Sequence, residues 1–211
     1  AIVNCAEAPT FENTVAALDL SGGLLEKVEG VLFNLSETDG TPELQTVVGK
    51  VIPMVSQHSS NIYLNSSLFE RVQKVYADSE FARESGCEDC GAALSREQQM
   101  LLDKVYRAFV ANGVALDSLK QDRMRQINSS LASLEQTFGT NLLAENNAFA
   151  AEFGISISQY AATMGSCSNR ELREKMFRAY STRGANGGAT DNREIIMKIL
   201  SLRQEKARLL G

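Results

Sequence analysis

The spacing most suggestive of a chemical site is Cys87-Glu88-Asp89-Cys90, two thiols separated by two residues. Such a pair can bind zinc or cycle between dithiol and disulfide. The sequence has no second C-x-x-C or H-x-x-H pair, and the motif does not follow a strand pattern as a thioredoxin-type site would. Because the acidic neighbours disfavour thiolates, the sequence favours free thiols in an exposed loop. A metal or redox pair is the alternative.

His58 is the one histidine in the sequence. A catalytic zinc needs about three protein ligands, so no histidine-based zinc centre can be assembled from this chain. Between Gln57 and Ser59, on a helical pattern, His58 is expected to be solvated or packed against another helix. A ligand to a neighbouring subunit or to a substrate is the alternative.

The acidic and basic side chains also lack a distinctive spacing. A pair of carboxylates can perform acid–base chemistry, but nothing singles out two of the available glutamates, Glu12, Glu26, Glu135, Glu145 and Glu152. We expect them on the solvated faces of amphipathic helices. Three arginines could hold a peptide carboxylate: Arg170, Arg173 and Arg183. The plainer interpretation is that they form ion pairs across the last two helices. We therefore assign no catalytic, cofactor-binding or metal-binding residue to this chain.

The charge balance and hydropathy exclude several classes of partner. The formal net charge is -5 and the 21 basic residues are scattered, which argues against a nucleic-acid surface. No apolar run approaches the roughly 18 to 20 residues that span a bilayer, and the first residues do not resemble a signal peptide. We expect no membrane partner and a cytoplasmic location with reduced thiols, unless targeting residues precede this sequence.

Apolar residues recur at spacings of three and four, which predicts helices over 11–35, 42–62, 66–83, 96–111, 117–145, 168–183 and 191–209. Gly22 and Gly23 predict a bend near Ser21. Polar capping residues precede the helices: Thr10, Thr41, Asn65 or Ser66, Ser95, Asp117 and Asp191. Four methionines beside the apolar stripes are expected to fill the core: Met100, Met124, Met176 and Met197.

Two segments interrupt the helical pattern. Residues 84–93 predict an exposed loop, and 149–165 predict a short extended run through Ile155 and Ile157 that lacks a partner strand. The fold class is therefore all-α, a bundle of about six to seven antiparallel helices.

Three stretches in this order resemble a known family. The first stretch comprises 9–14, Leu18 and 31–35. The second comprises Tyr106-Arg107, Phe109, Gly113, Ile127-Asn128, Leu131, Leu134, Phe138, Asn141 and Glu145. The third comprises 168–174, Tyr180, 183–184, 191–192, 202–203, 205–207 and 209–211. They are similar to the zinc metallopeptidases that comprise thimet oligopeptidase, oligopeptidase A and peptidyl-dipeptidase (dipeptidyl carboxypeptidase), and the last branch in particular.

The resemblance implies the N-terminal helical subdomain of a larger two-lobed peptidase, which walls a deep substrate channel and excludes folded proteins. In that family the chemistry lies downstream, on an H-E-x-x-H helix whose histidines bind zinc. Zinc would thus belong to the parent protein, and this chain alone should be inactive. Its partners would be the absent C-terminal catalytic domain and, in the parent, short peptide substrates.

The sequence departs from the family near 148–158, where the connection is shorter than in the family. We expect an N-terminal bundle at 1–148, a shortened irregular connection at 149–167, and a helical hairpin at 168–211 leading toward the absent catalytic domain. An apolar surface left uncovered would favour self-association. The alternative function is a free-standing helical interaction module without catalytic activity.

Overall fold

A computed structural model describes residues 1–38, 40–86 and 93–211, and within these ranges every regular element is helical. The all-α prediction is confirmed. The elements are a 3-10 turn at Ile2–Asn4, a π-helical turn at Phe11–Ala16, α1 (Ala17–Asp19), α2 (Gly23–Thr38), α3 (Pro42–Tyr63), α4 (Ser66–Ser85), α5 (Arg96–Ala111), α6 (Ser118–Phe153), a 3-10 turn at Ile157–Gln159, α7 (Tyr160–Ser166), α8 (Arg170–Ser181) and α9 (Arg193–Leu210).

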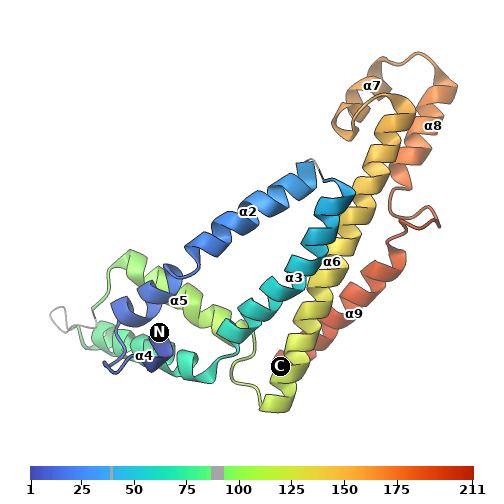
Figure 1. Ribbon diagram of the computed structural model, residues 1–211. Helices are drawn as coiled ribbons and strands as arrows, with labels where there is room; N and C mark the ends of the chain where they lie inside the picture. Colours follow the sequence, from blue (N-terminus) through green and yellow to red (C-terminus); the bar gives the residue numbers. More distant parts are fainter. Residues whose placement is uncertain (39, 87–92) are drawn as a thin grey trace.

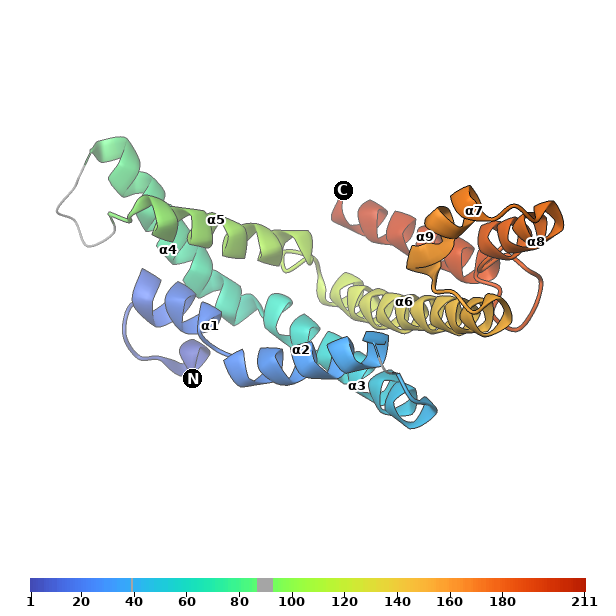
Figure 2. The ribbon, with the colours of Figure 1, turned by 90° about the horizontal axis from the view of Figure 1, so that it is seen from above.

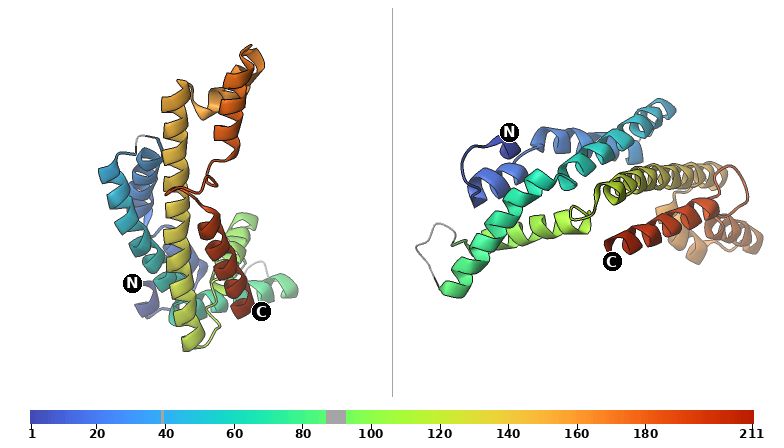
Figure 3. Two further views of the ribbon diagram at one scale, coloured as in Figure 1. Left: turned by 90° about the vertical axis from the view of Figure 1, so that its right-hand side faces the viewer. Right: turned by 90° about the horizontal axis from the view of Figure 1, so that it is seen from below.

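The 36-residue helix α6 is the spine of the molecule (Figure 1). Helix α3 runs antiparallel to it along one side and α9 antiparallel along another, and α2 lies outside α3 (Figures 1 and 3). The N-terminal turns, α4 and α5 gather near one end of α6, whereas α7 and α8 lie at the other end (Figure 2). The result is an elongated arrangement.

The main buried cluster joins the N-terminal turns to α4 and α5. Its members are Phe11, Val15, Leu68, Val72, Val75, Leu102, Phe109 and Val114. A second buried row on α6, Met124, Ile127 and Leu131, continues the stripe that the sequence predicts. Apolar burial of this kind is the main source of helical stability in a bundle.

Side-chain caps fix most helix starts where the sequence predicts them. The Thr41 hydroxyl accepts from the Leu44 N–H, the Asn65 side chain from the Leu68 N–H, and the Asp117 carboxylate from the Lys120 N–H. Ser95 forms the predicted capping box of α5. The predicted bend near Ser21 is a full break, because Gly22 adopts a left-handed φ of 83° between α1 and α2.

The predicted extended run at 149–165 is wrong. Helix α6 continues to Phe153, and 157–166 forms a 3-10 turn followed by α7. The apolar alternation at Ile155 and Ile157 covers only three residues, which is a weak local signal for a strand. The tertiary contacts on either side are more extensive: Phe149 is buried, and the ring of Tyr160 stacks on that of Tyr180 at 3.9 Å. These tertiary contacts outweigh the local pattern. Compared with the seven helices expected, α7 is additional, and the helix expected over 11–35 is divided into α1 and α2. The division into 1–148, 149–167 and 168–211 stays a prediction.

Two smaller expectations also need correction. The N-cap residue of α9 is Asn192 rather than Asp191, although the Asp191 carboxylate still accepts from the Arg193 N–H at 2.9 Å. Met124 and Met176 are buried as expected, but Met100 and Met197 lie on the outer faces of their helices and are exposed. The predicted loop at 84–93 with Cys87 and Cys90 falls largely on residues outside the described ranges.

Asp191 should make stability depend on acid pH. Hydrogen bonds from the Arg193 side chain, and then from the N–H groups of Arg193 and Gly187, hold the pKa of this carboxyl far below its ordinary value of 3.8. Because the folded-state pKa is depressed, the stabilisation is present above about pH 3.8 and is lost as the pH falls further. We expect Asp191→Asn to lower the melting temperature at pH 7, and the difference from the unchanged protein to shrink at about pH 2. An equal difference at both pH values would contradict this.

Candidate functional site

The residue types that could hold a metal are dispersed over the described part of the chain. His58 is exposed on α3, and Cys5 and Cys167 are free thiols far apart in the sequence. No group of three histidine, cysteine, aspartate or glutamate side chains among the described residues could hold a metal ion. Cys87 and Cys90 lie outside the described residues.

Four of the five glutamates available for acid–base chemistry are exposed, as expected: Glu12, Glu26, Glu135 and Glu152. Glu135 pairs with Arg203 at 2.6 Å and so joins α6 to α9. The expectation of a solvated carboxylate is wrong for Glu145, which is buried. It accepts hydrogen bonds from the Gly184 N–H, the Asn186 amide and the Thr190 hydroxyl, at 2.6, 2.6 and 2.5 Å. Helical spacing cannot reveal this role, because the donors lie about 40 residues further along the chain.

The arginines do not form the predicted ion pairs across the last two helices. Arg173 donates to the Cys167 carbonyl at 2.5 Å. Arg183 donates to the Asn146 side chain at 2.6 Å and lies 4.2 Å over the Tyr180 ring, while Arg170 is exposed. The reason is geometric, since α8 and α9 both pack on α6. The ion pairs that hold α9 come from α6 instead.

One of the ion pairs between α6 and α9 joins Arg123 to Glu205. The Arg123 guanidinium hydrogen-bonds both oxygens of Glu205, at 2.6 and 2.8 Å, and lowers the pKa of that carboxyl. Lys206 is partly buried beside them and donates to the Asn128 side chain at 2.9 Å; burial lowers the pKa of its ammonium. These groups stabilise the α6–α9 contact, and Arg123 and Glu205 also line a hollow between the two helices.

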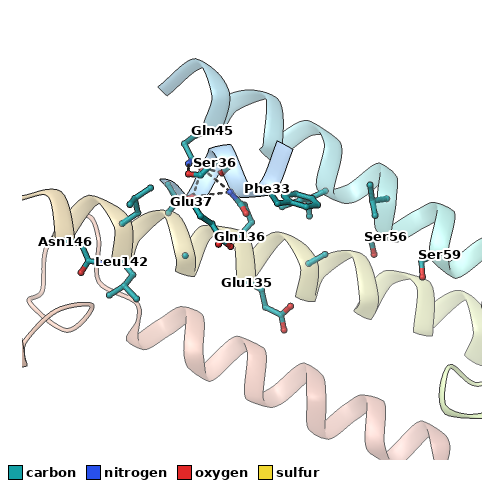
Figure 4. Close-up of a pocket in the computed structure, with 16 residues that line it drawn as sticks. Phe33, Ser36, Glu37, Gln45, Ser56, Ser59, Glu135, Gln136, Leu142 and Asn146 are labelled. Atoms are coloured by element: carbon teal, nitrogen blue, oxygen red, sulfur yellow. Dashed lines mark hydrogen bonds between the residues drawn. The ribbon is translucent and has the colours of Figure 1, made fainter. Parts of the chain in front are cut away.

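A groove of about 720 Å³ lies between α3 and α6 and is closed at one end by α2 (Figure 4). We call it the α3–α6 groove. Its lining mixes aliphatic, amide and hydroxyl groups: Phe33, Ser36, Glu37, Gln45, Ile52, Val55, Ser56, Ser59, Ala132, Glu135, Gln136, Gly139, Thr140, Leu142, Leu143 and Asn146. Of these residues, Glu135 alone is a candidate that the sequence raises, and it was assigned no role there.

Gln45 organises one end of the groove (Figure 4). Its amide nitrogen donates to the carbonyl and hydroxyl oxygens of Ser36, at 2.9 and 3.1 Å. Its amide oxygen accepts from Gln136 at 3.2 Å and from Thr140 at 3.3 Å. The network therefore fixes α2, α3 and α6 at one point.

The side chains that line the groove are suited to binding a ligand of mixed polarity. The amides and hydroxyls of the lining can exchange hydrogen bonds with a peptide backbone, and its aliphatic residues can contact apolar side chains. Glu37 and Glu135 supply the two carboxylates of the lining. In the part of the chain that the structure describes, no helix is long and apolar enough to cross a membrane.

Known proteins match this chain over nearly its whole length. No family model matches the chain. It is 30% identical to the dipeptidyl carboxypeptidase of Salmonella typhimurium over 244 residues, covering 100% of this chain and 34% of that protein. Two proteins of Escherichia coli, a dipeptidyl carboxypeptidase and oligopeptidase A, are each 28% identical to it. The first alignment covers 97% of this chain and the second 96%, and each covers 33% of the relative.

The resemblance that the motifs predict is thus confirmed along the whole chain, which spans about a third of the length of these relatives. The 244 aligned positions of the Salmonella relative exceed the 211 residues of this chain, so that relative carries additional residues inside the aligned region. A shortened connection near 148–158 would have this effect, and its position stays a prediction.

Proposed function

We propose that this chain is the non-catalytic N-terminal part of a zinc oligopeptidase of the peptidyl-dipeptidase type, where it walls the substrate channel and restricts access to short peptides. The observation that carries the proposal is the similarity over the whole chain to peptidases that are about three times as long. Location in the cytoplasm and short peptides as substrates belong to the same proposal.

The residues of this chain do not fit a catalytic zinc centre. One histidine cannot supply the two of an H-E-x-x-H helix, and His58 lies exposed with polar neighbours. We therefore derive no hydrolytic step from these residues and assign the metal chemistry to the remainder of the longer protein.

A helical layer that lines a substrate channel has to keep its shape when peptides bind, and helix α6 is suited to that role. It is tied to α9 by the Arg123–Glu205 and Arg203–Glu135 pairs, and to α2 and α3 through Gln45. The α3–α6 groove is the candidate surface for contacts with a peptide backbone, because it combines amides, hydroxyls and aliphatic groups.

The proposal predicts a division of activity between polypeptides. The 211-residue chain with added zinc should cleave short peptides no faster than a protein-free control. The product of the longer reading frame should contain an H-E-x-x-H helix, cleave the same peptides, and lose that activity to a chelator. Zinc-dependent cleavage by the 211-residue chain alone would contradict the proposal, as would a long product that does not cleave peptides.

The second candidate is a free-standing helical interaction module, and the exposed apolar residues of α2 favour it. The two candidates differ in the polypeptide expected beyond Gly211. A reading frame that ends at Gly211 would favour the module, whereas one that continues into an H-E-x-x-H helix would favour the peptidase.

A further inference from the structure

Helix α2 carries its apolar residues on the solvent side. Leu24, Val28, Val31 and Leu35 are spaced by four, three and four residues, which places them on one face of the helix. Their exposed fractions are 79, 56, 62 and 48%. We call these four residues the α2 stripe. Surface helices of globular proteins normally turn such a face toward the core.

The stripe faces away from the rest of the described molecule. Phe33 lies about half a turn around the helix from the stripe, and it lines the α3–α6 groove together with Glu37. The packing partner of α2 is α3, and α2 lies at the edge of the molecule outside it (Figures 1 and 3). The four stripe residues therefore point outward without an apolar neighbour layer over them.

We propose that the α2 stripe is the surface on which the remaining two-thirds of the longer protein docks, through an apolar face of its own. This inference rests on the proposed function. Exposed apolar stripes mark interaction surfaces, and the four residues carry no charge, so the complementary surface must itself be apolar.

The length of the relatives identifies the occupant. The dipeptidyl carboxypeptidases and the oligopeptidase A each align with at least 96% of this chain and add about twice as much polypeptide beyond the aligned third. That additional polypeptide is the largest component that these relatives have in common and the 211-residue chain lacks. A second copy of this chain is the competing occupant, and the experiment separates the two.

The test is the rate at which a thiol on the stripe reacts with a soluble maleimide. The four native cysteines are replaced by serine, and Val28→Cys is introduced into both the 211-residue chain and the product of the longer reading frame. Glu26→Cys, an exposed position on another face of the same helix, is the matched control. Far-UV circular dichroism verifies that each variant retains its helical content.

We expect the Val28→Cys thiol to react at least about tenfold more slowly in the longer protein than in the 211-residue chain, which corresponds to about 1.4 kcal/mol of protection. The Glu26→Cys thiol should react at similar rates in both. Equal rates for Val28→Cys in both proteins would overturn the docking inference. Slow reaction in the 211-residue chain that is relieved by dilution would overturn it in favour of a second copy.

Failure of the proposed function gives a different result. If the longer protein protects Val28→Cys but does not cleave peptides, docking stands and the peptidase proposal falls. If it cleaves peptides without protecting Val28→Cys, the peptidase proposal stands and docking falls. A reading frame that ends at Gly211 overturns both.

Discussion

Replacing Glu145 with alanine is expected to lower the free energy of unfolding by about 3 kcal/mol, because the buried Gly184 N–H and two further donors would lose a charged acceptor. The carboxylate is 9% exposed and accepts from the Gly184 N–H, the Asn186 amide and the Thr190 hydroxyl. Gly184 and Thr190 lie near the two ends of the loop between α8 and α9, so the variant should also open this loop. Urea unfolding followed by far-UV circular dichroism measures the first effect, and hydrogen exchange of the Gly184 amide measures the second.

Glu152→Ala is the matched control, since Glu152 is an exposed glutamate on the same helix. It should change the free energy of unfolding by less than about 0.5 kcal/mol. Glu145→Gln, which keeps one acceptor oxygen in place, should fall between the two. If Glu145→Ala and Glu152→Ala behave alike, or if the Gly184 amide exchanges at an unchanged rate in Glu145→Ala, the anchoring role is wrong.

The loop matters because it sets where α9 begins. Asn192, at the N-cap of α9, is 1% exposed; its amide donates to the Phe138 carbonyl at 3.1 Å and accepts from Asn141 at 2.9 Å. Gly184 has a φ of 71° and lies close to Asn192, so a side chain there would be strained. Glu145 and Asn192 together fasten α9 to the middle of α6.

Local signals in the sequence predict most of the helices correctly. Capping residues such as Thr41, Ser95 and Asp117 act on N–H groups three positions away, so their effect is visible without the rest of the fold. The break at Gly22 is local for the same reason. The prediction for 149–165 is wrong because the structure of this run depends on contacts such as that of Tyr160 with Tyr180, which lies in another helix.

The candidate site is much less predictable than the helices. Gln45 and Thr140 meet across 95 positions of sequence, and neither has a spacing that distinguishes it from an ordinary surface residue. Arg173 and Arg183 are expected from the sequence to bind carboxylates, yet Arg173 donates to the Cys167 carbonyl six residues earlier, and Arg183 donates to the Asn146 side chain on α6. Side-chain roles that depend on distant partners need the tertiary structure.

Replacing Phe109 with alanine should lower the free energy of unfolding by about 4 kcal/mol, more than the loss expected for Glu145→Ala. The side chain is fully buried in the cluster that joins α4, α5 and the N-terminal turns. Its ring lies 5.2 Å from that of Tyr63 and 5.7 Å from that of Phe69, so truncation removes aromatic contacts as well as burial. Chemical denaturation followed by far-UV circular dichroism measures the loss.

Phe81→Ala is the matched control because this ring on α4 is 72% exposed, and it should change the unfolding free energy by less than about 0.5 kcal/mol. Equal effects of the two truncations would show that the Phe109 cluster is not the stabilising core.

Phe109 and Glu145 lie at separate parts of the elongated molecule and share no partner, so their effects should add in the double variant. Faster exchange of the Gly184 amide in Glu145→Ala but not in Phe109→Ala would locate the α8–α9 loop in a separate unit of local unfolding.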